Sequence, residues 1–287
     1  MDILRTKDEI RAWRRGAQGR VALVPTMGYF HEGHIRLMRT ARSLADSVVV
    51  SLFVNPIQFG PTEDLSRYPR DLENDAAKAT ALGVDALFVP SADEIYGQSH
   101  ETYVYWPLLG ALLCGRTRPD HFRGVGTVVL KLINLTTPHV VPFGRKDGQQ
   151  VLLIDRMVKE LDLDIEIVVC PTVREPDGLA MSSRNSYLNP ADRVQALGIY
   201  AGLQAAKTLI EGGERRSAAI RNEMSQLMGK FPGLGVEYCD VVSRETLRPV
   251  DAVDHHAMVA VAGRVGTTRL IDNLWTIGTG GDIRVEL

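Results

Sequence analysis

Up to about residue 170, the chain alternates short apolar runs with stretches whose apolar residues recur at helical spacing. This alternation predicts an α/β fold, because a helix must return the chain before a second parallel strand can begin. Runs rich in Val, Ile and Leu are typical of strands that helices cover on both sides. We therefore expect a doubly wound parallel sheet. Strands are expected at Val21–Val24, Ser47–Phe53, Ala86–Val89, Val140–Phe143 and Ile165–Val169, and helices at Ile35–Leu44, Leu72–Leu82, Val125–Leu135 and Gln149–Leu161.

From about residue 175, the pattern changes to two helices followed by short strands. Asn189 is expected to cap the first of these helices, with Pro190 at its first position. The second helix is expected at Ser217–Met228, and the strands at Val236–Val242, Ala257–Ala262 and Thr267–Ile271. This order predicts a smaller α+β domain with a short antiparallel sheet. We place the two domains at 1–174 and 175–287, and the glycine-rich stretch after Asn273 follows no pattern that predicts an element.

The composition narrows the classes of protein to which the chain can belong. Its 287 residues are 45% apolar and 24% charged, as in ordinary globular proteins. A net charge of −2 lacks the basic excess typical of nucleic-acid binding, and the arginines at 11, 14, 15 and 20 are interpreted as a solvated helix face. The charged start is unlike a secretory signal, and no apolar run reaches the roughly 18 residues of a membrane span. Three widely spaced cysteines argue against a disulfide framework and favour a reducing cytoplasm.

Residues 25–34 read Pro-Thr-Met-Gly-Tyr-Phe-His-Glu-Gly-His and lie between the first predicted strand and the helix that follows it. A helix N-terminus has unpaired N–H groups and about half a positive charge, so it is a natural phosphate site. Histidines there add groups that can stabilise charge on a transferring phosphoryl group. His31 and His34 could instead be structural, or could bind zinc. Zinc is disfavoured, because two residues three apart supply only two ligands and no Cys or His cluster lies nearby.

Polar residues also follow other predicted strands, at the edge of the sheet where ligands of α/β folds collect. After the second strand, an Asn-Pro turn would hold Gln58, whose amide both donates and accepts hydrogen bonds. After the fourth, Gly144 permits close backbone approach and Lys146 supplies a positive charge. Asp147 could bind a ribose or cap the next helix.

Two further segments carry groups suited to anions. In His121–Gly126, Arg123 stands before a glycine-flanked helix start and is a candidate anion contact. The segment Arg174–Asn185 offers two serine hydroxyls and the guanidinium of Arg184, which together could bind a polyphosphate. The same segment could be an ordinary polar linker between the domains, or a loop that closes over a site.

Together, these clusters resemble the pantothenate synthetase family, ATP-dependent ligases that join pantoate to β-alanine. The resembling stretches are Pro25–His34, Asn55–Gly60, Tyr68–Arg70, His121–Gly126, Gly144–Gln150 and Arg174–Asn185. They span the predicted first domain and its junction with the second, in the family's order. The His-x-Gly-His motif alone would indicate only the wider nucleotidyltransferase superfamily, which includes class I aminoacyl-tRNA synthetases. The resemblance implies a Rossmann-like nucleotidyltransferase domain with a small lid domain, and a reaction through a pantoyl adenylate.

The resemblance also implies roles for individual residues. The implied ATP-binding residues are Met27, Gly28, Tyr29, Phe30, His31, Glu32, Gly33, His34, Gly144, Arg145, Lys146, Asp147, Val173, Met181, Ser182, Ser183 and Arg184. The implied catalytic groups are His34, His31, Lys146, Ser182, Ser183 and Arg184. Gln58 and Gln150 would bind pantoate, and Gln58 would also lie near β-alanine. Magnesium is expected on the ATP phosphates with no protein metal site, and the enzyme is expected to be a homodimer with no nucleic-acid or membrane partner.

Four positions depart from the usual family pattern. Tyr29-Phe30 replaces a small residue followed by Leu, Arg145 replaces an acidic or amide residue, Gly148 replaces a frequent aromatic, and Pro142 is atypical. None removes a polar group assigned to chemistry, although Arg145 adds charge near the nucleotide and Gly148 is expected to loosen a helix start.

Two other functions remain open from the sequence. One is a related nucleotidyltransferase that passes AMP to a phosphate acceptor, whose pocket would need extra cations where this chain has Gln58 and Gln150. The other is a non-catalytic nucleotide-binding protein, which would have lost some of the polar groups assigned to chemistry. His31, His34, Lys146 and Arg184 are all present.

Overall fold

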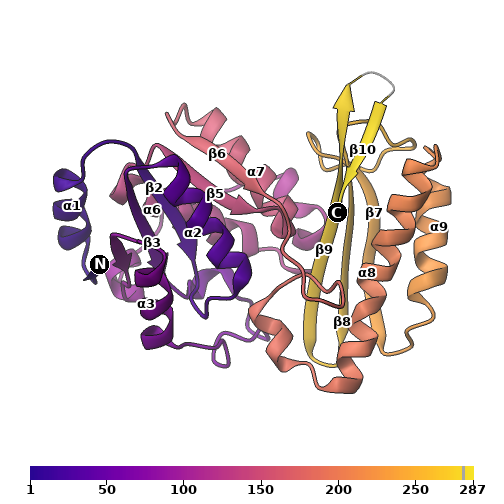
Figure 1. Cartoon of the computed structure of the whole chain (residues 1–287), viewed down its shortest axis with the longest axis horizontal. Helices are drawn as coiled ribbons and strands as arrows, with labels where there is room; N and C mark the ends of the chain where they lie inside the picture. The colour runs from indigo at the N-terminus through magenta and orange to yellow at the C-terminus, as the bar shows by residue number, and fades with distance from the viewer. Residues whose placement is uncertain (280–281) are drawn as a thin grey trace. The chain divides into compact units, whose positions relative to one another are not determined.

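The computed structural model describes residues 1–279 and 282–287, which form two compact units (Figure 1). The first unit consists of Met1–Ala111, Gly115–Gly144 and Leu153–Cys170. The second consists of Leu112–Cys114, Arg145–Leu152 and Pro171–Leu287. Two short segments that precede Pro171, Leu112–Cys114 and Arg145–Leu152, therefore belong to the second unit. The division into domains at 1–174 and 175–287 stays a prediction.

The first unit contains a six-stranded sheet in the order β1-β4-β3-β2-β5-β6, and all of its strand pairs are parallel. The strands are β1 (Asp2–Leu4), β2 (Val21–Thr26), β3 (Ser47–Leu52), β4 (Ala86–Phe88), β5 (Val140–Gly144) and β6 (Glu166–Cys170). Helices flank this sheet, so the predicted doubly wound parallel fold is confirmed. Strand β1 was not predicted, because its three residues are defined by pairing with the distant β4 and not by a local apolar run.

The helices in this part of the chain are α1 (Lys7–Gly16), α2 (Glu32–Leu44), α3 (Leu72–Ala81), α4 (Ala92–Tyr96), α5 (Cys114–Thr117), α6 (His121–Thr136) and α7 (Gly148–Glu160), with 3₁₀ turns η1 (Pro56–Gln58), η2 (Leu109–Ala111) and η3 (Arg145–Asp147). Helices α2, α3, α6 and α7 overlap the predicted ranges, whereas no range was predicted for α1, α4 and α5. Helix α1 carries Arg11, Arg14 and Arg15, as the interpretation of a solvated helix face requires. Arg20 is the exception: it precedes β2 and pairs with Glu166 on β6 at 2.7 Å.

The strand order reverses at β2, with β3 and β4 on one side and β5 and β6 on the other. Side chains of β2 and β3 pack against α2 in a buried apolar cluster that includes Val24, Val50 and Met38. In sheets of this type, ligands bind beyond the carboxyl ends of the strands at the point of reversal. The chain leaves β2 into the histidine-bearing loop and leaves β5 at Gly144, so two of the predicted motifs begin at this point.

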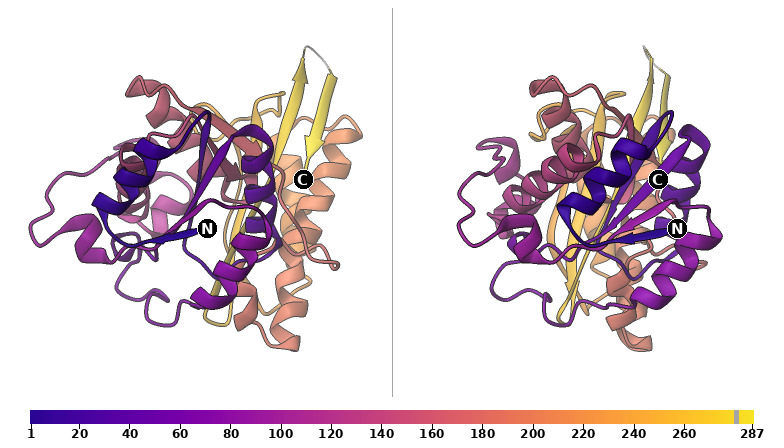
Figure 2. Two further views of the ribbon diagram at one scale, coloured as in Figure 1. Left: turned by 60° about the vertical axis from the view of Figure 1, so that its left-hand side comes forward. Right: turned by 90° about the vertical axis from the view of Figure 1, so that its left-hand side faces the viewer.

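The second unit contains a four-stranded antiparallel sheet in the order β10-β9-β8-β7. Its elements are η4 (Ser183–Tyr187), α8 (Pro190–Glu211), α9 (Ser217–Met228), β7 (Leu234–Ser243), β8 (Ala257–Val265), β9 (Thr268–Thr279) and β10 (Asp282–Glu286). Helices α8 and α9 lie together along this sheet, and their apolar residues share one buried cluster with β8 (Figure 2). Asn189 accepts a hydrogen bond from the Asp192 N–H at 2.9 Å, which confirms the predicted cap. The predicted small antiparallel domain fold is likewise confirmed.

The last predicted strand is longer than expected, because β9 continues to Thr279 and pairs with β10. Its alternation is interrupted by two buried polar residues, Asp272 and Asn273, which hid the strand from sequence analysis. Gly280 and Gly281 of the glycine-rich stretch lie outside the described residues. Within the described residues, no helix is both long enough and apolar enough to cross a membrane.

Candidate active site

The two histidines of the His-x-Gly-His motif cap helix α2. His31 is the N-cap, and its Nδ1 accepts a hydrogen bond from the Gly33 N–H at 3.1 Å. His34 lies one turn later, and its Nδ1 accepts from the His31 N–H at 3.3 Å. The two ring centroids are 4.1 Å apart. The predicted position of both imidazoles at a helix N-terminus is therefore confirmed.

These hydrogen bonds determine the chemistry that each ring can offer. A backbone N–H that donates to Nδ1 leaves the proton of a neutral imidazole on Nε2. His31 and His34 therefore present Nε2–H groups as donors at the first turn of α2. A phosphate at this position would meet hydrogen-bond donors and the positive end of the helix dipole.

Gly33 is required by the His31 ring. A Cβ at this position would lie 2.8 Å from Cε1 and 2.9 Å from Nδ1 of His31. We expect Gly33→Ala to displace that ring and to lower pantoate-dependent pyrophosphate release by about tenfold. The lost cap and the better helix propensity of Ala are each worth about 1 kcal/mol and oppose each other, so stability should change little. Steady-state kinetics measure the loss of activity, and urea denaturation measures the free energy of unfolding. A large fall in the free energy of unfolding together with the loss of activity would contradict the prediction.

The loop before His31 is held by two residues of α3. Asp75 is 1% exposed and accepts hydrogen bonds from the N–H groups of Tyr29 at 2.7 Å and Phe30 at 2.6 Å. Lys78 donates to the Phe30 carbonyl at 2.7 Å. Tyr29 has a φ of 55°, a left-handed conformation that strains a residue other than glycine. Burial raises the pKa of Asp75 above its usual range, and the two hydrogen bonds and the charge of Lys78 offset this in part.

Sequence analysis missed Asp75 and Lys78, because nothing local connects α3 to a loop 45 residues earlier. It also assigned Phe30 to ATP, but the side chain of Phe30 is 3% exposed and belongs to the apolar core. What Phe30 can offer a ligand is therefore its backbone. The role of the loop in binding ATP stays a prediction.

Asp75 provides a test of this anchor. In Asp75→Asn, an amide NH₂ would face one of the two buried N–H donors, which then loses its acceptor. We therefore expect the free energy of unfolding to fall by about 2 kcal/mol. The KM for ATP should rise as the loop loosens. Asp71→Asn is a matched control: Asp71 caps the same helix by accepting from Asn74 N–H, and Asn caps equally well. Urea denaturation of both variants checks this, and equal stabilities would contradict it.

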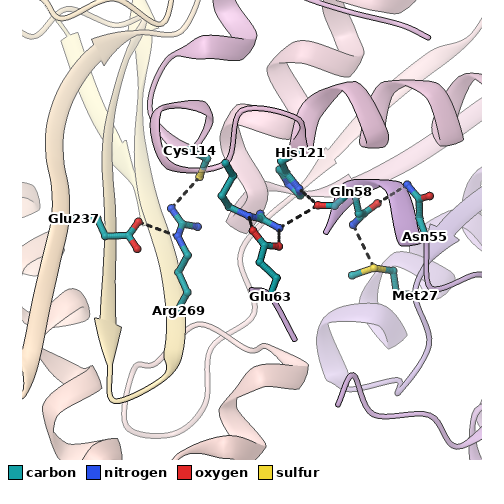
Figure 3. A network of polar contacts seen from close by, with 9 residues as sticks. Met27, Asn55, Gln58, Glu63, Cys114, His121, Glu237 and Arg269 are labelled. Atoms are coloured by element: carbon teal, nitrogen blue, oxygen red, sulfur yellow. Dashed lines mark hydrogen bonds and ion pairs between the residues drawn. The ribbon is translucent and has the colours of Figure 1, made fainter. Parts of the chain in front are cut away.

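Gln58 lies beside the end of β2, held by its neighbours (Figure 3). Its Nε2 lies 3.3 Å from Met27 Sδ, and its Oε1 accepts from Asn55 Nδ2 at 3.0 Å. Asn55 is 1% exposed and also accepts a hydrogen bond from the Tyr96 hydroxyl at 2.6 Å. The structure thus brings Met27 and Gln58, from the ends of adjacent strands, into contact. Sequence analysis missed Asn55, whose burial could not be read from an Asn-Pro turn.

The glycines of His121–Gly126 serve packing. This segment forms the first turns of α6, so the expectation that Arg123 precedes the helix is wrong. Arg123 pairs with Asp120 at 3.2 Å and lies over the Tyr103 ring. A Cβ at Gly124 would lie 2.6 Å from the carbonyl oxygen of Ile57, so this glycine lets α6 approach the turn that carries Gln58. The His121 ring contacts the Gln58 carbonyl at 3.0 Å (Figure 3).

In the second unit, the turn η3 is docked on β9. Asn273 Nδ2 donates to the carbonyl oxygens of Arg145 and Lys146, both at 2.9 Å. Lys146 Nζ lies 3.4 Å from Asp147 Oδ1. A Cβ at Gly148 would come within 3.0 Å of Asn273 and Met258, so the helix start is closely packed and the expected loosening is wrong.

Pro142, another atypical position, lies in β5 of the first unit, in register with Val168 of β6.

Arg145 is buried and paired, whereas it was predicted from the sequence to bind ATP and to add charge near the nucleotide. The residue is 4% exposed and forms an ion pair with Glu286 of β10.

The segment that contains the predicted phosphate-binding serines is a hairpin held by hydrogen bonds and an ion pair. The Met181 N–H donates to the Val173 carbonyl at 2.9 Å, and Arg174 pairs with Asp272 at 2.6 Å. Ser182 caps η4 by accepting from the Arg184 N–H at 3.3 Å. The predicted residues Val173, Met181, Ser182, Ser183 and Arg184 are thereby brought together on this hairpin. A loosely tethered linker is excluded by these contacts.

The two glutamines at the start of α7 differ in their surroundings. Gln149 is 6% exposed and bonds the backbone of Leu112 and Cys114 at 2.8 and 3.0 Å. Gln150, the next residue, is partly exposed. Cys114 also lies 3.6 Å from Arg269, which pairs with Glu237 (Figure 3). These contacts explain why the short segment Leu112–Cys114 belongs to the second unit.

The predicted site residues thus form two groups, each on one unit. Met27–His34 and Gln58 lie in the first unit, and Arg145–Asp147, Gln150 and the hairpin lie in the second. Within the described part of the chain, no group of three or more His, Cys, Asp or Glu side chains could hold a metal ion.

Known proteins of one family resemble this chain along nearly its whole length. The sequence model of one family, described as pantoate-beta-alanine ligase, matches residues 2–275. A pantothenate synthetase of Thermotoga petrophila is 49% identical, over 95% of this chain and 99% of its own. The crystal structure of pantothenate synthetase from Thermus thermophilus superposes with a TM-score of 0.91 at 44% identity, covering 95% of this chain and 98% of its own.

A second similar structure is that of a pantoate-beta-alanine ligase from Francisella tularensis, complexed with beta-gamma ATP and β-alanine. That protein is 34% identical to this chain, and the two structures superpose with a TM-score of 0.80. The alignment covers 98% of this chain and 100% of that one. Because the matches run nearly end to end at this identity, this chain belongs to the pantoate–β-alanine ligase family.

Proposed function

We propose that this protein uses ATP to join pantoate to β-alanine, giving pantothenate, AMP and pyrophosphate. Its family membership supports the overall reaction. The observation that carries the chemistry is the pair of imidazoles at the start of α2, whose Nδ1 atoms are occupied by backbone N–H groups. That arrangement suits the stabilisation of phosphoryl charge.

In the first step, a pantoate carboxylate oxygen attacks the α-phosphorus of ATP. A bond forms between the carboxylate oxygen and the α-phosphorus. The bond from the α-phosphorus to the oxygen that bridges it to the β-phosphorus breaks, and pyrophosphate leaves with the electrons of that bond. Negative charge grows on the α-phosphate in the transition state. We propose that His34 and His31 donate from Nε2 to these oxygens, and that Lys146, Ser182, Ser183 and Arg184 bind the phosphates.

In the second step, the β-alanine amine attacks the acyl carbon of pantoyl adenylate. A C–N bond forms, the C–O bond to AMP breaks, and the amine loses a proton. We propose that Gln58 and Gln150 orient pantoate and that Gln58 also lies near β-alanine. A hydrogen bond from Asn55 Nδ2 to Gln58 Oε1 holds the Gln58 amide in a defined orientation, which supports its use in recognition.

We propose that the other ATP-binding residues contact the nucleotide mainly through their backbone. They are Met27, Gly28, Tyr29, Phe30, Glu32, Gly33, Gly144, Arg145, Val173 and Met181. Asp147 would bind the ribose. Mg²⁺ would arrive on the ATP phosphates and neutralise part of their charge. The cationic groups Lys146 and Arg184 suit phosphate oxygens and not a metal ion, which fits this assignment.

The reaction is tested with the purified full chain, ATP, Mg²⁺, pantoate and β-alanine. AMP and pantothenate are expected in equal amounts, and pyrophosphate release should require pantoate. Omitting β-alanine should leave a single turnover of pyrophosphate. A folded sample that releases no pyrophosphate with pantoate would overturn the proposal. Release with a phosphomonoester in place of pantoate would favour the phosphate-acceptor alternative, which family membership disfavours.

We further propose that the protein works in the cytoplasm as a homodimer. Static light scattering on the purified chain would test the dimer, and a monomer mass would contradict it.

A further inference from the structure

Arg145 stands out among the residues of η3 because its charge is buried. Its side chain is 5% exposed and pairs with Glu286, whose side chain is 44% exposed. Arg145 Nε has no hydrogen-bond partner among the described residues. Burial lowers the pKa of Arg145, the charge of Glu286 raises it, and the like charge of Arg174 lowers it further. The charge of Asp272 also raises the pKa of Arg145, but Asp272 is itself paired with Arg174, so without Glu286 two arginines would share one carboxylate.

Glu286 lies beyond the residues that the family model matches. The family match ends at residue 275, whereas β10 spans Asp282–Glu286 and runs antiparallel beside β9 (Figure 1). The register places Glu286 opposite Trp275, two residues beyond the Asn273 that holds the η3 carbonyl oxygens. Residues two apart on a strand share one face. Strand β9 therefore holds the backbone of η3, and β10 neutralises its buried side chain.

We propose that Glu286 is a positioning residue for the nucleotide loop Arg145–Asp147, so that the C-terminal strand outside the family-matched region sets the affinity for ATP. This rests on the proposed function, in which Lys146 and Asp147 bind ATP. Removing the Glu286 charge leaves the Arg145 charge unbalanced, and the guanidinium then gains by moving toward water. Because η3 has only three residues, that movement shifts Lys146 and Asp147 as well.

The test compares Glu286→Gln with Asp282→Asn, the same chemical change on the same strand at a side chain that is 74% exposed. Glu286→Gln is expected to raise the KM for ATP about tenfold. The kcat and the KM values for pantoate and β-alanine should stay within about threefold, and Asp282→Asn should match the unmodified protein. Equal KM values for ATP in the two variants would overturn the proposal. An equal rise in all three KM values would also overturn it, since that indicates a general loss of structure.

Two further measurements separate the ion pair from other effects. In an Arg145→Gln background, Glu286→Gln should change the KM for ATP by less than about twofold, because the charge to be balanced is gone. Glu286→Asp keeps the negative charge, so its KM for ATP should lie between those of Glu286→Gln and the unmodified protein. This variant also tests the proposal if Glu286→Gln does not fold.

Amide hydrogen exchange provides a readout that does not depend on catalysis. Without ATP, exchange in residues 145–152 should be faster in Glu286→Gln than in Asp282→Asn. An unmodified protein with no pantoate-dependent pyrophosphate release overturns the proposed function, and the exchange result then decides whether Glu286 positions the loop. Unchanged exchange in an active protein, together with an unchanged KM, overturns this inference alone.

Discussion

Replacing His34 with Ala is expected to lower pantoate-dependent pyrophosphate release by about 10³-fold, the effect of removing a preorganised donor to a developing negative charge. The two ring nitrogens of His34 have different tasks in the proposed mechanism. Nδ1 accepts the His31 N–H at 3.3 Å and shapes the turn, whereas Nε2 is the donor that we propose for the chemistry. Alanine removes both, so this variant by itself does not separate them.

Asn and Gln at position 34 separate the two tasks. The side-chain oxygen of Asn can take the place of Nδ1, so His34→Asn should keep the turn and still lose about 10³-fold in rate. The longer Gln can place an amide N–H near the position of Nε2, so His34→Gln should retain more activity than Asn. Pyrophosphate release under single-turnover conditions measures the rates, and circular dichroism reports the fold. If His34→Asn were as active as the unmodified protein, His34 would be structural.

Lys146→Ala is expected to lower the same rate by about 10²- to 10³-fold, because a cation aimed at a transferring phosphate is lost. The Lys146 side chain is 21% exposed, and its backbone carbonyl is held by Asn273, so its direction is set by the protein. Its neighbour Asp147 lies 3.4 Å from Nζ. The substitution leaves the Asn273 hydrogen bond in place, so stability should change little.

Lys159→Ala is the matched control for this prediction. Lys159 lies on the next helix, is 71% exposed and pairs with Asp155 one turn away, an interaction worth about 0.3–0.5 kcal/mol. Its loss should leave pyrophosphate release unchanged. Comparable rates for Lys146→Ala and Lys159→Ala would remove Lys146 from the chemistry.

Much of the fold was predictable, because periodicity and caps are local. The strands around the histidine loop lie within two residues of their predicted ranges, and Asn189 caps α8 as its position before Pro190 indicated. The position of His31 and His34 at a helix start was also predictable, since a strand, a short loop and a helical pattern follow one another directly in the sequence.

The predictions were wrong where a residue's role depends on a distant partner. Gly148 was expected to loosen a helix, but it allows close packing against Asn273 and Met258. Arg123 was expected to precede a helix start, yet it lies inside α6 and pairs with Asp120. In both cases, a local rule about glycine or arginine was applied without knowledge of what lies across from the residue.

The sequence by itself determined the α/β class, the order of most strands and helices, and the family to which the motifs point. Only the tertiary structure decided which atoms of those motifs remain available for chemistry. It occupies the Nδ1 atoms of His31 and His34, anchors their loop on Asp75, and pairs Arg145 with a residue 141 positions later. The physical reason is range: periodicity and capping act over one or two turns, whereas burial and hydrogen bonding between distant segments exist only once the chain has folded.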